Sequence, residues 1–64
     1  MSDFTPDLER ILRDNNCTFK RQGKGDHAIW YSPLSKRCFV VDQAIKSRHT
    51  ANAVLKQAGL PKAF

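Results

Sequence analysis

Three things are scarce in this chain of 64 residues: cysteine, acidic side chains and long apolar runs. The two cysteines, Cys17 and Cys38, match neither a zinc-ligand spacing nor a CxxC redox motif. We interpret both as small apolar residues on neighbouring strands, without a disulfide. No apolar run approaches the roughly 20 residues of a transmembrane helix, and the first residues do not resemble a secretory signal. We therefore expect a cytoplasmic protein that does not contact a membrane.

The short chain also limits the kind of site that the protein can build. Sixty-four residues suffice for one small domain, which we expect to span 1–64. A hydrophobic core of that size cannot also enclose a deep pocket. Any active site should therefore be shallow and lie on the surface.

Acidic residues are few and unevenly placed. The chain has six of them against eleven lysines and arginines, a net charge of +5. Residues 1–16 hold two basic and four acidic residues, a net of −2, whereas residues 17–64 hold nine and two, a net of +7. This asymmetry is typical of a protein that meets a polyanion. The alternative is a basic surface with no such partner.

Apolar spacing and turn residues predict the order α-β-β-β-α. A first helix should begin at Thr5, an N-cap candidate followed by Pro6, and end at Asn15-Asn16. A second helix should be capped by Ser47 and end before Gly59. Three strands are expected over 17–22, 26–31 and 37–41, the last two joined by a turn over 32–36. The predicted fold class is α+β, a three-stranded antiparallel meander with both helices packed on one face.

The glycine-rich stretch between the first two predicted strands is the most informative feature. Gly23 and Gly25 permit a tight turn with positive φ. That turn would hold His27 at a rim, with Arg21 and Lys24 on the approach. An acid–base group that titrates near neutral pH, beside cations, suggests phosphodiester chemistry. The alternative is a structural histidine that bonds a hydroxyl or carbonyl group of the loop.

Strand alternation indicates where these side chains point. If Ala28 and Trp30 face the core, then His27 and Tyr31 face the opposite, open side of the sheet, together with Ile29. Phe19, Trp30, Tyr31 and Phe39 lie at strand spacing, where aromatic residues more often belong to the core than to a base-stacking surface. We retain only Tyr31 as a candidate base contact.

The predicted start of the second helix, Lys46-Ser47-Arg48-His49-Thr50, carries cations where the helix dipole opposes them. A phosphate held there by backbone N–H groups and Arg48 would remove the conflict. The alternative is a solvated basic helix end. The two distant histidines do not make a metal site, and no nucleotide-binding glycine motif opens a helix. The residues thus indicate a small nucleic-acid-binding domain, with cleavage as a further hypothesis.

Several motifs occur in order along nearly the whole chain: Gly23-Lys24-Gly25-Asp26-His27 with Ile29-Trp30, then Phe39-Val40-Val41, then Lys46 to Leu60 with its Leu-Lys-Gln-Ala-Gly ending. Together they resemble the HicA (YcfA-like) toxin family, the small mRNA interferases of type II toxin–antitoxin systems. The resemblance implies a fold similar to a double-stranded RNA-binding domain. It also implies an endoribonuclease that needs no metal or other cofactor, with His27 as the catalytic histidine, and a HicB-type antitoxin partner that covers the active surface.

Two residues depart from the family pattern. Asp26 stands where a serine is common, and its carboxylate would either orient His27 or weaken the binding of an anionic substrate. Asp42 stands where many members have a proline, which leaves the path from the third strand into the second helix open.

The mechanism is a hypothesis at this point. RNA phosphates would dock on cations and on the start of the second helix, while His27 acts as base on a ribose 2′-OH or as acid on the leaving oxygen. The candidate RNA-binding residues are Arg21, Lys24, Gly25, Lys46, Ser47, Arg48 and His49. Two alternatives are a module that binds RNA or DNA without cutting it, and a toxin fold that has lost activity but keeps its antitoxin contacts.

Overall fold

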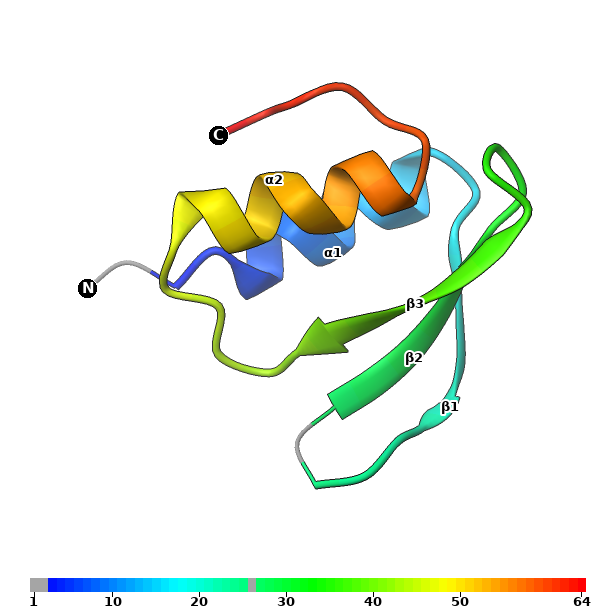
Figure 1. The fold of residues 1–64 in the computed structure, drawn as a ribbon, viewed down its shortest axis with the longest axis horizontal. Coiled ribbons are helices and arrows are strands. Elements are labelled where there is room, and N and C mark those ends of the chain that lie inside the picture. Colours follow the sequence, from blue (N-terminus) through cyan, green and yellow to red (C-terminus); the bar gives the residue numbers. More distant parts are fainter. Residues whose placement is uncertain (1–2, 26) are drawn as a thin grey trace.

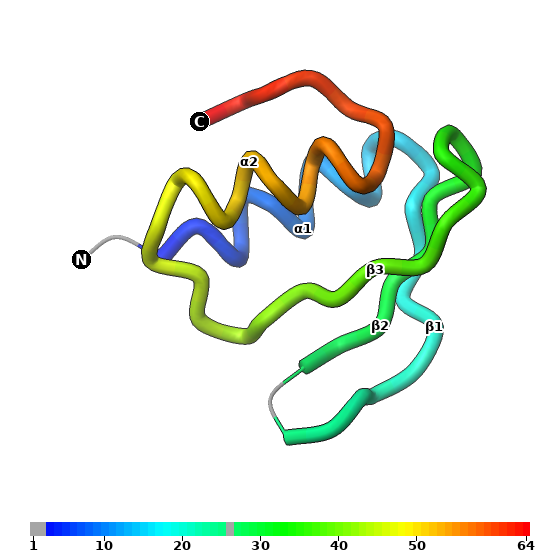
Figure 2. Tube along the Cα trace, viewed as in Figure 1, coloured from blue at the N-terminus to red at the C-terminus, as the bar shows by residue number. Residues whose placement is uncertain are grey.

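The computed structural model describes residues 3–25 and 27–64. Its elements follow the predicted order: α1 (Thr5–Asp14), β1 (Thr18–Gln22), β2 (His27–Ser32), β3 (Arg37–Asp42) and α2 (Arg48–Gln57). The strands form one antiparallel sheet in the order β1-β2-β3. Figures 1 and 2 show both helices on the same face of this sheet. The predicted α+β architecture, similar to a double-stranded RNA-binding domain, is confirmed.

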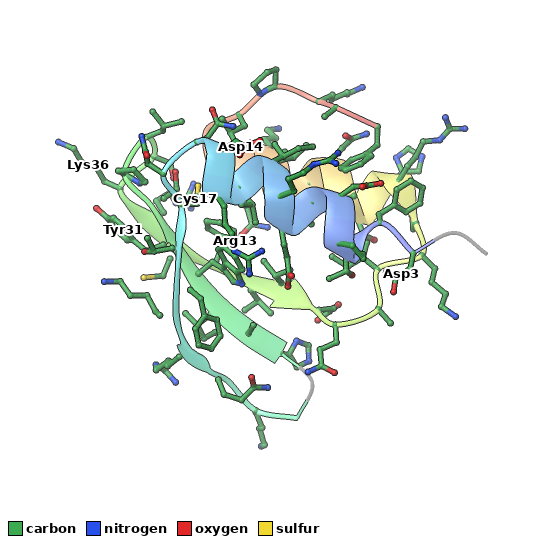
Figure 3. All side chains as sticks on the ribbon, turned by 180° about the vertical axis from the view of Figure 1, so that it is seen from behind. Asp3, Arg13, Asp14, Cys17, Tyr31 and Lys36 are labelled. Atoms are coloured by element: carbon green, nitrogen blue, oxygen red, sulfur yellow. The ribbon has the colours of Figure 1, made fainter. Side chains whose placement is uncertain are left out.

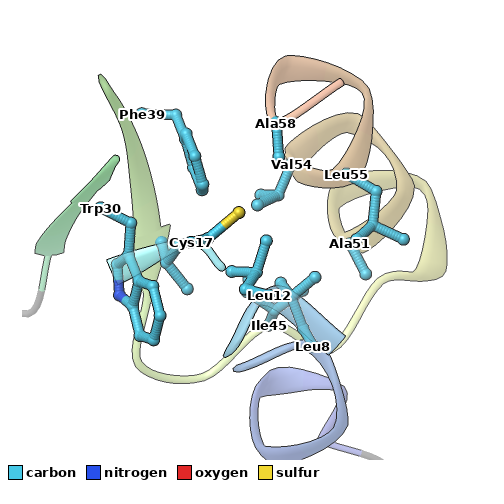
Figure 4. Packing of buried hydrophobic residues seen from close by; sticks show 11 residues of the cluster. Leu8, Leu12, Cys17, Trp30, Phe39, Ile45, Ala51, Val54, Leu55 and Ala58 are labelled. Atoms are coloured by element: carbon cyan, nitrogen blue, oxygen red, sulfur yellow. The ribbon is translucent and has the colours of Figure 1, made fainter. Parts of the chain in front are cut away.

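The core lies between the sheet and the two helices. Trp30 and Phe39 are directly paired across β2 and β3, so both side chains point to the helical side. The helices contribute residues at helical spacing, and three residues outside the helices and strands complete the core. Figure 4 shows these side chains meeting in one cluster, which contains Leu8, Leu12, Cys17, Trp30, Phe39, Val41, Ile45, Ala51, Val54, Leu55 and Ala58.

The start of α1 differs from the prediction in a way that matters for the site. Phe4, not Thr5, occupies the N-cap position, and the Thr5 side chain makes no cap hydrogen bond. The buried Thr5 hydroxyl instead donates to the carbonyl of Asp42 at 3.3 Å and accepts from the N–H of Ile45 at 2.9 Å. The N–H of Phe4 also donates to the carbonyl of Ile45, at 2.8 Å. The start of α1 therefore fixes the connection between β3 and α2.

The remaining helix ends follow the prediction more closely. Asn16 has a φ of 68° after α1 and Gly59 a φ of 81° after α2, the left-handed conformation typical of helix C-termini. Ser47 occupies the N-cap position of α2, but its side chain makes no cap hydrogen bond. The backbone N–H groups at the start of α2 are thus not satisfied by that hydroxyl.

Two interpretations of individual side chains are wrong. Cys17 is buried, but Cys38 is exposed on β3, and both are free thiols on segments that are not neighbours in the sheet. Phe19 is 51% exposed, although its ring still meets the edge of Trp30, with centroids 6.3 Å apart. Cys38 is paired with Tyr31 on the open face of the sheet, and Phe19 lies on the edge strand β1, where alternation alone does not produce burial. In the described part of the chain, no helix has the length and apolar character needed to cross a membrane.

Candidate active site

The turn between β1 and β2 is closed by backbone hydrogen bonds around His27. The N–H of Gly23 donates to the carbonyl of His27 at 2.7 Å, and the N–H of His27 donates to the carbonyl of Lys24 at 3.3 Å. The Gln22 side-chain amide donates to the carbonyl of Gly25 at 3.0 Å. The backbone of His27 is therefore held from both directions at the first position of β2.

The two glycines of this turn serve different purposes. Gly25 has a φ of +64°, as predicted, and a side chain there would be strained. Gly23 does not have a positive φ, so that part of the prediction is wrong. A Cβ on Gly23 would instead lie 3.1 Å from the carbonyl oxygen of His27 and 3.3 Å from Cδ1 of Ile29. Gly23 thus permits the close approach of the two strands that sets the position of His27.

His27 lies on the open face of the sheet and contacts a carboxylate. It is directly paired with Asp42 at the end of β3. Its Nδ1 lies 2.6 Å from Oδ1 of Asp42. The two side chains are 52% and 47% exposed, so the pair remains accessible to a large substrate. Among the described residues, no hydrogen bond or ion pair engages the other ring nitrogen, Nε2.

The sequence did not indicate Asp42 as the partner of His27. Asp42 attracted notice only as a departure from the family pattern, and the carboxylate considered as a partner was Asp26. Asp26 lies outside the described residues, so its predicted role stays a prediction. The signal that identifies Asp42 is the register of the hairpin formed by β2 and β3, which places it directly opposite His27.

Cations gather on the β1 side of the same face. Arg21 is exposed and pairs with Ile29, two residues beyond His27 on the same face. An irregularity in the pairing between Phe19 and Arg21 leaves Lys20 without a partner position, and its Nζ lies 5.2 Å from the centroid of the Tyr31 ring. Regular strand alternation would place Lys20 and Arg21 on opposite faces, so the sequence did not predict Lys20 as a cation of the open face. A bulge is what brings both cations to the open face.

Aromatic rings mark the two faces of the sheet. Tyr31 is half-buried and its side chain points outward from β2 (Figure 3), as predicted for the open face. On the other side, Arg13 extends from α1 toward the sheet, and its guanidinium carbon lies 5.3 Å from the Trp30 ring. Tyr31 is thus the aromatic side chain of β2 that a ligand on the open face could reach.

The remaining predicted binding residues fall into two groups. Lys24 and Gly25 lie exposed in the turn that precedes His27, so the structure brings them and Arg21 to the histidine's end of the sheet. The second group lies exposed at the start of α2, and in residues 3–25 and 27–64 no hydrogen bond or ion pair joins it to His27. This second group is Lys46, Ser47, Arg48 and His49. Figure 1 shows the short connection from the end of β3 to the start of α2.

A comparison with models of protein families shows to which family the chain belongs. The family model described as the HicA toxin of bacterial toxin-antitoxin systems matches residues 5–60 of the chain. The chain belongs to the HicA toxin family. No curated protein and no solved structure matches the chain significantly. Family membership gives the protein a toxin role within a toxin–antitoxin system and implies an antitoxin partner.

Proposed function

We propose that this HicA toxin is an endoribonuclease that cleaves mRNA without a metal ion and uses His27 as its general acid or base. The observation that carries this proposal is the placement of His27. Its backbone is fixed by the glycine turn, its side chain is half-exposed, and its Nδ1 is engaged by Asp42 while Nε2 faces no described partner. A histidine so placed suits proton transfer at neutral pH.

The proposed reaction is a transesterification within the RNA. Nε2 of His27 takes the proton of a ribose 2′-OH, the 2′-oxygen bonds to the adjacent phosphorus, and the bond from phosphorus to the 5′-oxygen breaks. With His27 as the base, the leaving 5′-oxygen takes its proton from solvent water; with a protonated His27 as the acid, the leaving oxygen takes the proton of Nε2 and the proton of the 2′-OH passes to solvent water. The products would be a 2′,3′-cyclic phosphate and a 5′-hydroxyl. The atoms balance with no metal and no water as nucleophile.

The cations would bind the phosphates and stabilise the charge that builds on phosphorus. Arg21 and Lys24 are exposed on the same strand and turn that lead to His27. The backbone of Gly25 would allow a phosphate to approach the turn, since apart from its chain neighbours no described residue lies within 4 Å of where a Cβ would be. The start of α2 offers a second phosphate contact through Lys46, Ser47, Arg48 and His49. Each of these assignments is a proposal that rests on exposure and charge.

The partner within this proposal is an antitoxin of the HicB type that covers the open face of the sheet. A protein that occupied this face would block the approach of RNA to His27. The proposed substrate, mRNA, also places the activity in the cytoplasm. Within the same proposal, residues 1–64 form one toxin domain.

The test is an RNA cleavage assay with purified protein in the presence of EDTA. Wild type should cleave, and His27→Ala should lose cleavage by about 10²–10⁴-fold because its acid–base group is gone. His49→Ala removes the other histidine, which is proposed only to contact phosphate, so it should raise KM for RNA and leave kcat unchanged. Equal cleavage by wild type and His27→Ala would contradict the role of His27. Loss of wild-type cleavage in EDTA would contradict the metal-free mechanism.

A further inference from the structure

The contact between His27 and Asp42 is built by two independent sets of hydrogen bonds. On one side, the β1–β2 turn holds the backbone of His27 through Gly23 and Lys24. On the other side, the buried hydroxyl of Thr5 binds the carbonyl of Asp42 and is itself fixed by the N–H of Ile45. Both partners therefore have constrained backbones, and their side chains meet on the open face at 2.6 Å.

A purely stabilising role explains this arrangement poorly. Both side chains are about half exposed, and exposed ion pairs contribute little to the free energy of folding because water and salt screen them. The Thr5 hydroxyl at the start of α1 nevertheless holds the backbone carbonyl of Asp42. The precision of the contact points to a role in orienting the imidazole.

The chemistry of a carboxylate at Nδ1 is specific. A carboxylate that accepts a hydrogen bond from Nδ1–H selects the neutral tautomer with its lone pair on Nε2, and it restrains rotation of the ring. When Nε2 takes up a proton, the resulting imidazolium is stabilised by the adjacent negative charge. In this scheme Asp42 only accepts the hydrogen bond, so the one proton that the pair gains or loses is the proton on Nε2.

We infer that Asp42 is a positioning residue that holds His27 with Nε2 toward the RNA; the role rests on the ribonuclease activity proposed above. Asp42 contacts no reacting atom in this scheme and acts only through His27. Its removal should therefore lower kcat and leave KM for RNA nearly unchanged. A cation-binding or phosphate-repelling role would instead change KM.

The experiment compares Asp42→Asn with wild type in steady-state RNA cleavage at fixed salt. We expect kcat to fall about 10- to 100-fold, less than the roughly 10⁴-fold loss when the buried aspartate of a catalytic triad is replaced, because Asp42 is half-exposed; KM should change by less than about two-fold. Asp42→Glu keeps a carboxylate and should recover part of the lost kcat. Asp14→Asn is the matched control, because it removes the same charge at the far end of α1 (Figure 3) and should leave kcat and KM unchanged.

A spectroscopic measurement separates orientation from general disturbance of the fold. Nitrogen-15 NMR of the His27 ring should show the Nδ1–H tautomer in wild type and a shift toward Nε2–H in Asp42→Asn. The backbone contact of Thr5 is with the carbonyl of residue 42, so Asp42→Asn should keep the native circular dichroism spectrum and melting temperature.

The outcomes distinguish this inference from the proposed function. If wild type cleaves RNA in EDTA but Asp42→Asn has the same kcat or the same His27 tautomer as wild type, the positioning role is overturned and the ribonuclease function stands. If wild type does not cleave RNA at all, the proposed function falls and the inference falls with it.

Discussion

The two ends of β2 each carry a polar residue, and they are used in opposite ways. Ser32 at the last position is fully buried, and its hydroxyl donates to the carbonyl of Ala58 at 2.6 Å and accepts from the N–H of Leu34 at 3.2 Å. His27 at the first position is half-exposed, and among the described residues its side chain contacts the Asp42 carboxylate, which is itself half-exposed. The hydroxyl at the end of β2 thus makes its hydrogen bonds within the fold, whereas the histidine at the start of β2 has a ring nitrogen, Nε2, without a partner in residues 3–25 and 27–64.

The difference teaches how to separate structural from functional polar groups here. A buried hydroxyl must be satisfied or its desolvation is costly, so Ser32 has a clear structural reason to be polar. His27 has no comparable reason, because an exposed imidazole is satisfied by water. Its fixed backbone and its carboxylate partner are therefore best explained by chemistry at the surface.

The largest expected effect is on activity at the exposed end. His27→Ala should lower the RNA cleavage rate by about 10²–10⁴-fold, yet change the free energy of unfolding by no more than about 0.5 kcal/mol, as is usual for surface substitutions. Cleavage assays paired with urea unfolding measure both quantities. Strong destabilisation with an unchanged cleavage rate in the folded protein would assign His27 to the fold instead.

The next largest effect is on stability at the buried end. Ser32→Ala should lower the free energy of unfolding by about 1–3 kcal/mol, because the backbone groups that it serves lose a buried partner. Cleavage by the folded protein at saturating RNA should be unchanged. Ser35→Ala is the matched control, since the buried Ser35 hydroxyl has no hydrogen-bond partner among the described residues and its removal should cost nothing. Similar melting curves for the two variants would refute the structural role of Ser32.

A third variant tests the structural role and the catalytic role together. Thr5→Val removes the hydroxyl that binds both Asp42 and Ile45, so it should cost about 1–3 kcal/mol of unfolding free energy. It should also lower kcat by a few-fold, because the carboxylate beside His27 loses its anchor. Thr18→Val changes an exposed threonine of β1 and should affect neither quantity. A stability loss with no change in kcat would show that the anchor of Asp42 is irrelevant to catalysis.

The smallest effect concerns RNA binding near each end of β2. Lys24→Gln, in the turn before His27, should weaken RNA binding and reduce the slope of log K against log salt by about 1, as for the loss of one phosphate contact. Lys36→Gln makes the same charge change in the turn after Ser32, where Lys36 projects from the other end of the sheet (Figure 3), and should leave the slope unchanged. Binding titrations at several salt concentrations measure both slopes, and equal slopes for the two variants would remove Lys24 from the interface.

Much of this fold could be predicted from local pattern, because its elements are short and clearly delimited. Apolar spacing and the Thr5-Pro6 start predicted α1, and the glycine after α2 predicted the end of that helix. Alternation along β2 also placed His27 and Tyr31 on the open face correctly. These features depend on neighbours in sequence, which is why the sequence alone reveals them.

The partner of His27 could not be predicted, because it depends on the strand register. A turn over residues 32–36, as predicted, would pair Tyr31 with Arg37 and therefore His27 with Val41. In the structure β2 continues to Ser32, the turn has four residues, and His27 pairs with Asp42. A shift of one residue changes which side chains share a face. The bond that helps to keep Ser32 at the end of β2 comes from Ala58, 26 residues away, and no local pattern contains it.

The most direct test of catalysis by His27 is to identify the ends of the RNA that purified wild-type protein produces in EDTA. Attack by a 2′-oxygen under acid–base control predicts 2′,3′-cyclic phosphate and 5′-hydroxyl ends that are absent with His27→Ala. Products with 3′-hydroxyl and 5′-phosphate ends, or the same cyclic ends at the same rate from His27→Ala, would contradict it.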